Sequence, residues 1–166
     1  MAALKVMGCD PSTYTGLCQL EGDKHTTKLL HFDKARGFER LQLIAQSFHN
    51  TVTEWSPDIV VIEGYAYGNA HSLVTLVEVG TLLRKTLYDL KISWYDAPPT
   101  LLKKFTTGKG NSNKKAIAEA VLNRWGFASK SDDVVDAYAL ARLGQALASG
   151  DATFVNGVSY HGTEQQ

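Results

Sequence analysis

The stretch DIVVIEG, residues 58–64, holds four consecutive β-branched apolar residues followed by a glutamate. Such residues favour β-strands. Because apolar and polar residues do not alternate within the run, both faces of this strand must be covered, as in the central strand of a sheet with helices on either side. Glu63 stands at the carboxyl end of the strand, which is the end where sites form in open α/β sheets.

Three strand patterns and a helix pattern precede this stretch. The strand patterns are residues 3–9, 16–22 and 25–32, with Gly22-Asp23 as the turn signal between the second and the third. Consecutive strands joined by short turns pair in an antiparallel manner. Residues 37–55 place apolar side chains three and four positions apart, which predicts a helix that ends at Ser56-Pro57.

Helices and one further strand follow the stretch. Residues 72–90 are apolar around most of a helical circumference, so this helix has two surfaces to bury. The other expected elements are a strand at 91–97, a short helix at 100–105, a loop at 106–113, a helix at 114–125 with Asn113 as its N-cap, and a last helix from Ser131 to about Ala148.

This order of elements predicts an α/β fold with a five-stranded mixed sheet, whose first three strands are antiparallel, and with helices on both faces. Strand-helix-strand crossovers are right-handed, so strand 58–64 can return beside the first strand and parallel to it. Asp10, at the end of the first strand, and Glu63 would then lie together. A chain of 166 residues has the length of one domain. We predict that this domain spans residues 1–150 and that residues 151–166 form a loose tail.

Charge and composition narrow the classes of partner. Seventeen basic residues balance seventeen acidic ones, so a nucleic acid or a membrane surface could be bound only by a local patch. The sequence has no apolar signal-peptide segment and no run of about 18 apolar residues, so no membrane partner is predicted and a cytoplasmic location is expected. Cys9 and Cys18 lack the spacing of a redox pair or a zinc site and fit a role in the core.

Acidic residues begin the otherwise apolar helix SDDVVDAYALA, residues 131–141. Asp133 and Asp136 are three positions apart and share one face, which can lie over the strand ends that carry Asp10 and Glu63. Four converging carboxylates without matching Arg or Lys repel one another unless a cation lies among them. Oxygen ligands select Mg²⁺ or Mn²⁺ over Zn²⁺, and two such ions in one site can hydrolyse a phosphodiester bond.

Each acid has a simpler explanation when it is taken alone. Acidic residues in a first helical turn cap the helix and complement its dipole, a role that suits Asp132. Asp10 before Pro11 is also compatible with ordinary turn chemistry. The metal-site hypothesis therefore depends on finding all the acids in this order and at these structural positions.

Five lysines and no acid lie between residues 97 and 118, around the glycines of segment 108–110. Positive charge concentrated in a neutral protein indicates phosphate contact, which positions DNA without reading its sequence. The candidate DNA-binding residues here are Lys103, Lys104, Lys109, Lys114 and Lys115. The alternative is a solvated loop with a lysine-rich helix start, although lysines at a helix N-terminus oppose the helix dipole.

The segments GCDPSTYTG (8–16), VVIEGYAYGNAHS (60–72) and SDDVVDAYALA (131–141), in this order, resemble the RuvC group of Holliday junction resolvases. The resemblance implies an RNase H-like fold and a metal-dependent endonuclease. It also implies roles for individual residues. The matches to the four acidic catalytic positions are Asp10, Glu63, Asp133 and Asp136, and the matches to functional lysines are Lys103 and Lys114.

Two departures from the family pattern concern the positioning of DNA. The family usually has Asp-Pro-Gly where this chain has Asp10-Pro11-Ser12. It often places an aromatic residue, which wedges into the junction, where this chain has Ala66. Tyr65 and Tyr67 flank that position and are the candidate DNA-contacting substitutes. The differences fit a divergent, phage-encoded branch acting in the host cytoplasm.

The main functional hypothesis is a homodimeric DNA endonuclease that resolves four-way and other branched junctions by paired symmetric cuts. A symmetric dimer supplies two equivalent sites, and the apolar helix at 72–90 is the candidate interface, with burial inside one chain as the alternative. A ribonuclease acting on RNA/DNA hybrids would have to recognise the 2′-OH. A non-catalytic junction-binding module would not need the acidic set, and an actin-like ATPase would need two large lobes.

Overall fold

The computed structural model describes residues 2–66 and 70–163. This part of the chain contains a six-stranded mixed sheet with the spatial order β3-β2-β1-β4-β5-β6. The strands are β1 (Lys5–Asp10), β2 (Tyr14–Glu21), β3 (Lys24–His31), β4 (Ile59–Glu63), β5 (Trp94–Ala97) and β6 (Ser159–His161). β1, β4 and β5 run parallel to one another, whereas β1-β2, β2-β3 and β5-β6 are antiparallel pairs.

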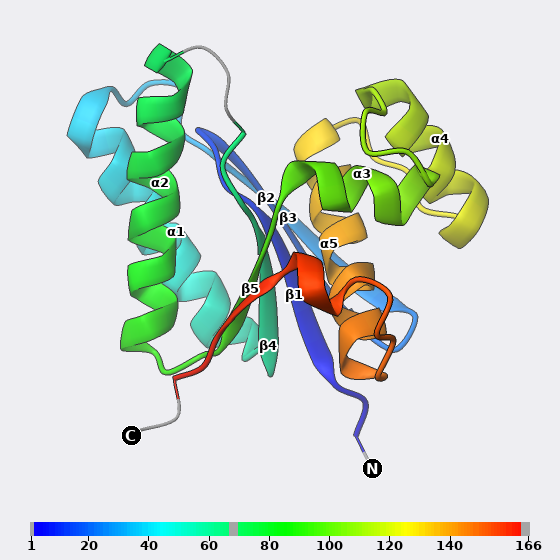
Figure 1. The fold of residues 1–166 in the computed structure, drawn as a ribbon. Helices are drawn as coiled ribbons and strands as arrows, with labels where there is room; N and C mark the ends of the chain where they lie inside the picture. Colours follow the sequence, from blue (N-terminus) through cyan, green and yellow to red (C-terminus); the bar gives the residue numbers. More distant parts are fainter. Residues whose placement is uncertain (1, 67–69, 164–166) are drawn as a thin grey trace.

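Helices cover both faces of the sheet (Figure 1). On one face lie α1 (Gly37–Trp55) and α2 (Ala70–Asp89), and on the other lie α3 (Pro99–Thr107), α4 (Lys114–Trp125) and α5 (Asp132–Ala148). Val61 and Ile62, which are neighbours on β4, belong to the hydrophobic cores on opposite faces. The prediction of a central strand covered on both sides is therefore confirmed.

The helix ends follow local sequence signals. The Asn113 side chain accepts a hydrogen bond from the Ala116 N–H, and the Ser131 side chain accepts one from the Val134 N–H, so both predicted N-caps are confirmed. Gly126 ends α4 in the left-handed conformation, with φ of 69°. No helix within the described residues combines the length and the hydrophobicity needed to cross a membrane.

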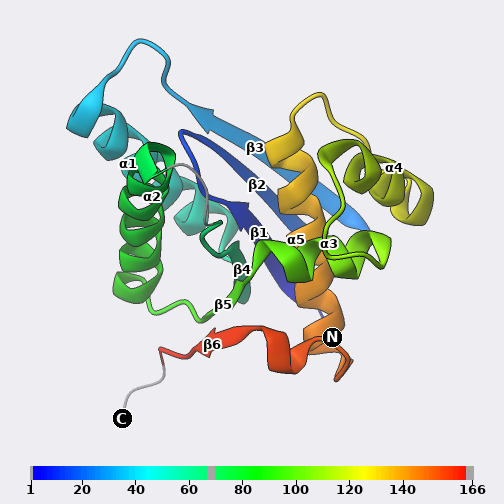
Figure 2. The same ribbon diagram turned by 45° about the horizontal axis from the view of Figure 1, so that its top comes forward.

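The sixth strand corrects the predicted sheet of five. β6 lies within residues 151–166, where the sequence predicts a loose tail, and pairs with the outer side of β5 (Figure 2). The ring of His161 stacks on Trp94 with centroids 4.9 Å apart, and its Nε2 lies 2.7 Å from the Asp96 carboxylate. A strand of three exposed residues has no hydrophobic periodicity, so only these cross-strand contacts reveal it.

Two glycines let α5 lie unusually close to the sheet. A Cβ added at Gly8 on β1 would come within 1.9 Å of the Ala137 carbonyl oxygen, and one at Gly16 on β2 within 2.1 Å of the Asp133 carbonyl oxygen. Any larger residue would force the helix away. The first turns of α5 are thereby held directly over the ends of β1 and β2.

Cys9 and Cys18 are both buried in the sheet. Burial raises the pKa of the Cys18 thiol to about 12 and also raises the pKa of the Cys9 thiol. Both side chains therefore remain protonated and act as small apolar residues, in agreement with the predicted core role.

Candidate active site

The parallel pairing of β1 and β4 brings two carboxylates together. Cys9 lies opposite Ile62 in the register, so the next residues, Asp10 and Glu63, leave the two strands side by side. The N-terminal end of α5 lies near the same edge of the sheet, in the upper part of Figure 1. One carboxylate oxygen from each of three residues, Asp10, Glu63 and Asp136, lies within 4.8 Å of the other two.

Asp133 joins this group from the first turn of α5. Asp10 lies close enough to the Glu63 and Asp133 carboxylates to influence the pKa of each. The four acids singled out in the sequence therefore converge, and we call them the acidic cluster: Asp10, Glu63, Asp133 and Asp136. Asp132, between the Ser131 cap and Asp133, is exposed and lies in the first helical turn, as expected for a residue that complements the helix dipole.

Burial and mutual repulsion raise the pKa values throughout the acidic cluster. Burial is the larger cause for Asp10, whose pKa is raised well above its usual value, and the Glu63 carboxylate raises it further. Burial, and then the Asp136 carboxylate, raise the pKa of Glu63 to about 7. The pKa values of Asp133 and Asp136 are also raised by burial, against the opposing effect of Lys114. The site therefore carries more negative charge than its surroundings neutralise.

Two oxygens of the acidic cluster are buried without a hydrogen-bond donor among the described residues. They are Oε2 of Glu63 and Oδ1 of Asp136. A buried carboxylate oxygen without a donor is costly, and a divalent cation would satisfy it. The atoms that could coordinate a metal ion here are all carboxylate oxygens, which are the ligands that hard cations prefer. The residues present therefore fit a divalent metal ion.

The predicted lysines separate into two groups. The Lys114 ammonium pairs with Asp136, and this contact outweighs the effect of burial and raises the Lys114 pKa. Lys103 lies close enough to Glu63 to lower that residue's pKa. The other three face elsewhere: Lys104 lines a hollow beside the C-terminal segment, Lys109 is exposed in the α3-α4 loop, and Lys115 pairs with Glu119.

Comparison with known proteins agrees with this geometry. The family model described as "Crossover junction endodeoxyribonuclease RuvC" matches residues 6–143, a range that contains the whole acidic cluster. The chain belongs to the RuvC family.

Individual RuvC proteins are distant relatives. The crossover junction endodeoxyribonuclease RuvC of Thermosipho melanesiensis is 28% identical over 148 residues, which cover 83% of this chain and 94% of that protein. The RuvC of Prochlorococcus marinus strain NATL1A is 27% identical over 108 residues, covering 64% of this chain and 70% of the relative. Both identities are low, so the relationship rests on the family match over most of the chain.

Solved structures confirm the RNase H-like α/β fold. Thermus thermophilus RuvC in complex with a Holliday junction substrate superposes with a TM-score of 0.75 at 19% identity, covering 89% of this chain and 97% of that one. The yeast mitochondrial Holliday junction resolvase superposes with a TM-score of 0.58 at 12% identity, covering 90% of this chain and 82% of that one.

Of the two tyrosines proposed to replace the wedge residue of the RuvC family, the structure describes only Tyr65. Tyr67 lies outside the described residues. Tyr65 is half-buried beside α2, where Nη1 of Arg84 donates a hydrogen bond to its hydroxyl over 3.3 Å. The sequence analysis missed Arg84 and its partner Asp96. The available signal was a single arginine in a largely apolar helix and a single aspartate in a short apolar strand.

Proposed function

We propose that the protein is a homodimeric, metal-dependent endonuclease that resolves four-way DNA junctions, and accepts other branched DNA, by paired symmetric cuts. The observation that carries this proposal is the convergence of four carboxylates from β1, β4 and α5, beside two lysines, in a chain of the RuvC family. The structurally similar Thermus thermophilus RuvC was solved with a Holliday junction substrate. We assign the nuclease domain to residues 1–150, with β6 from residues 151–166 extending its sheet.

The acidic cluster would be both the catalytic centre and the ligand set for two Mg²⁺ ions, for which Mn²⁺ can substitute. Two observations support this role. All its candidate metal ligands are oxygens, and two of these oxygens have no hydrogen-bond donor among the described residues. Bound divalent ions supply Lewis-acid stabilisation of the phosphate and a more acidic water. Asp10 is the candidate ligand of both ions, because its carboxylate lies close to those of Glu63, Asp136 and Asp133, whose charges raise its pKa.

The lysines and tyrosines would hold the DNA around this centre. Lys103 and Lys114 lie beside the acidic cluster and would neutralise the scissile phosphate. Lys104, Lys109 and Lys115 are exposed and would contact phosphates farther along the strand, which fixes position without reading sequence. Tyr65 and Tyr67 would contact bases or sugars next to the cut.

The helix α2 is the proposed dimer interface. Its inward face, with Val79, Leu83 and Leu87, is buried against the sheet and α1. Its outer face leaves Val74 59% and Val77 39% exposed. Apolar residues gathered on an exposed helix face are typical of a protein contact, and a two-fold contact there would give the two sites that paired cutting requires.

The decisive experiment is cleavage of an end-labelled immobile four-way junction, beside a linear duplex and an RNA/DNA hybrid, with Mg²⁺ and with chelator. We expect paired nicks near the crossover in Mg²⁺ alone, and neither Asp10→Asn nor Asp133→Asn should cut while both still bind the junction. Asp132→Asn is the matched control, because its carboxylate is exposed next to the cluster and outside it.

Other outcomes would contradict the proposal. Cleavage of the hybrid in preference to the junction would make the protein a ribonuclease. Tight junction binding without a nick in either Mg²⁺ or Mn²⁺ would make it a binding module and leave the acidic cluster unexplained. Wild-type cleavage by both the Asp10 and the Asp133 variants would refute the residue assignment.

A further inference from the structure

A partly buried ion pair lies behind the acidic cluster, on the other face of the sheet. Arg84 projects from α2, and its side chain is 16% exposed. Its Nε and Nη2 both donate to Oδ1 of Asp96 on β5, over 2.8 and 2.6 Å. The other oxygen of Asp96, Oδ2, lies 2.7 Å from Nε2 of His161 on β6. Asp96 therefore fixes the orientation of the guanidinium plane.

The remaining donors of Arg84 reach the end of β4. Nη2 lies 3.4 Å from the carbonyl oxygen of Glu63, and Nη1 donates to the Tyr65 hydroxyl over 3.3 Å. The guanidinium carbon also stands 5.0 Å from the centroid of the Tyr65 ring, in a cation-π contact. One side chain thus contacts the residues immediately before and after Gly64, at the point where β4 delivers Glu63 to the acidic cluster.

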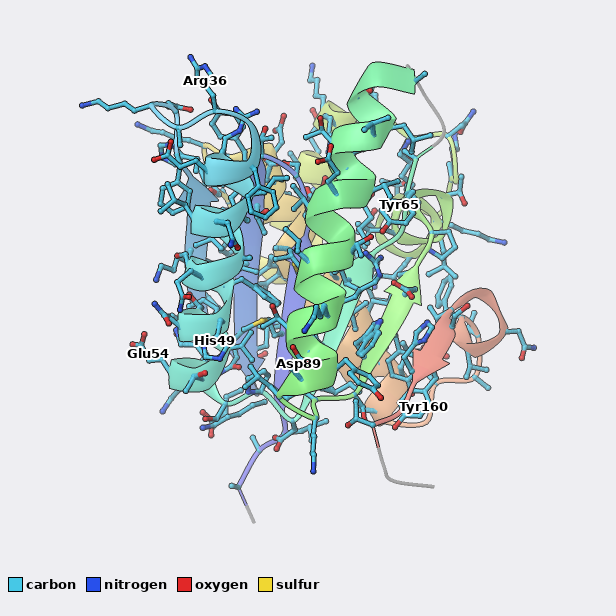
Figure 3. The ribbon with its side chains drawn as sticks, turned by 90° about the vertical axis from the view of Figure 1, so that its left-hand side faces the viewer. Arg36, His49, Glu54, Tyr65, Asp89 and Tyr160 are labelled. Carbon is cyan, nitrogen blue, oxygen red and sulfur yellow. The ribbon has the colours of Figure 1, made fainter. Side chains whose placement is uncertain are left out.

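Gly80 on α2 provides the space for this arrangement. A Cβ at Gly80 would come within 2.6 Å of Arg84 Nη1 and within 2.9 Å of the Tyr65 hydroxyl oxygen. Figure 3 shows Tyr65 beside α2, near the end of β5. The tyrosine ring is therefore packed between the helix and the guanidinium, and the chain leaving β4 is held on this face of the sheet.

Stability alone is a weak reason for this ion pair. Even a fully buried ion pair costs about as much as its attraction returns, and the pair here is only partly buried. Arginine differs from an apolar residue in presenting five donors in one rigid plane. Here that plane joins a strand, a carbonyl and a hydroxyl that no single apolar side chain could join.

We infer that Arg84, oriented by Asp96, is a positioning residue that sets the Glu63 carboxylate within the acidic cluster. This inference rests on the proposed function of that cluster. Among the described residues, Oε2 of Glu63 has no hydrogen-bond partner, so no hydrogen bond at that oxygen orients the carboxylate. The Arg84 contact fixes the backbone from which that carboxylate projects. Displacements of about 1 Å at a reacting group are enough to lower rates strongly.

The test compares Arg84→Met, Arg84→Lys and Asp96→Asn with the control Lys28→Met. Lys28 is exposed on β3, outside the proposed interface on α2 and outside the candidate DNA-binding lysines. Three quantities are measured for each variant: the single-turnover cleavage rate at saturating junction, the affinity for Mn²⁺ by calorimetry without DNA, and the junction affinity in chelator.

We expect Arg84→Met to lower both the cleavage rate and the Mn²⁺ affinity by about tenfold, the usual size for losing a group that orients a metal ligand. Junction affinity in chelator should stay within about twofold of wild type, because the five candidate DNA-binding lysines are unchanged. Arg84→Lys should recover part of the loss. Arg84→Met and Asp96→Asn should be non-additive in combination, since both break one network, and Lys28→Met should match wild type.

The inference is overturned if Arg84→Met keeps the wild-type cleavage rate and Mn²⁺ affinity, or if the two substitutions add. If Arg84→Met does not fold by circular dichroism, Asp96→Asn and Tyr65→Phe carry the same comparison with smaller changes in volume. If the wild type itself does not cut junctions, the proposed function fails separately, and the Mn²⁺ affinities still decide whether Arg84 positions Glu63.

Discussion

Two groups of charged residues meet at the end of β4, and they differ in how the charges are balanced. In the acidic cluster, the four carboxylates have one direct cationic contact within residues 2–66 and 70–163, from Lys114 to Asp136. In the second group, Arg84 is matched by Asp96, which also holds His161. Burial raises the pKa of every carboxyl in the first group.

The difference separates a site for chemistry from a support. A set of buried charges that is balanced internally can hold its geometry without a ligand. An unbalanced set is tolerated only where an external cation or a proton completes it. Under the proposed function, the acidic cluster would therefore bind metal, whereas the group around Arg84 would hold the strand that carries one of the proposed ligands.

The largest expected effect comes from removing a charge of the unbalanced group. Glu63→Gln keeps the shape of the side chain but removes a ligand charge, and we expect the cleavage rate to fall by about 1000-fold, since metal-ion stabilisation contributes several kcal/mol. Glu54→Gln, at an exposed position of α1, is the control. Single-turnover cleavage measures the effect, and a loss below about tenfold would remove Glu63 from the catalytic set.

The lysines provide the next test. Lys114→Met removes the ammonium that pairs with Asp136, and we expect a loss of cleavage of roughly 30-fold, within the range seen for charge-assisted contacts. Lys115→Met removes an exposed ammonium that pairs with Glu119, and it should weaken junction binding slightly while changing the rate by less than about threefold. Equal losses of cleavage rate for the two variants would show that contact with the acidic cluster does not distinguish the role of Lys114 from that of Lys115.

The effect of Asp10→Asn on the free energy of unfolding should have opposite signs with and without metal. In chelator, Asp10→Asn relieves repulsion and should raise the free energy of unfolding by about 1 kcal/mol, the size of one pKa unit. In saturating Mg²⁺ the wild type should be the more stable protein, because the ligand is intact. Urea unfolding in the two buffers measures this, and a destabilised Asp10→Asn in chelator would contradict the repulsion argument.

The same repulsion predicts a pH dependence of the metal-free protein. Glu63 has a pKa raised from 4.5 to about 7 in the folded state, so the folded state holds its proton more tightly than the unfolded state. Stability in chelator should therefore decrease as the pH rises from about 4.5 to about 7. Glu63→Gln should flatten this decrease in melting curves, and an unchanged slope would assign the decrease to other groups.

The smallest effect is expected at His161, which contacts Asp96 from β6. His161→Ala removes the contact from β6 to Asp96 but leaves both bonds from Arg84 to Asp96. We expect the melting temperature to fall by about 2 °C and the cleavage rate to stay within about twofold. A loss as large as that of Arg84→Met would extend the positioning network to β6.

The acidic cluster could be predicted from sequence because each of its members follows a local signal. Asp10 and Glu63 each end a buried apolar run, and Asp133 and Asp136 share one face of a helix with a recognisable cap. Handedness of the crossover then brings the two strands together. The Arg84-Asp96 pair could not be found in this way, because a lone charge in an apolar helix does not indicate which distant charge it meets.

The amino-acid sequence by itself determined the order of strands and helices, the buried character of β4, the helix caps and the four acids, because these depend on periodicity, turn chemistry and short-range hydrogen bonds. Only the tertiary structure decided which lysines face the acids, that β6 extends the sheet, and that Arg84 holds the end of β4. Those features depend on contacts between residues far apart in the chain, and such contacts exist only once the sheet and its two helical layers have packed.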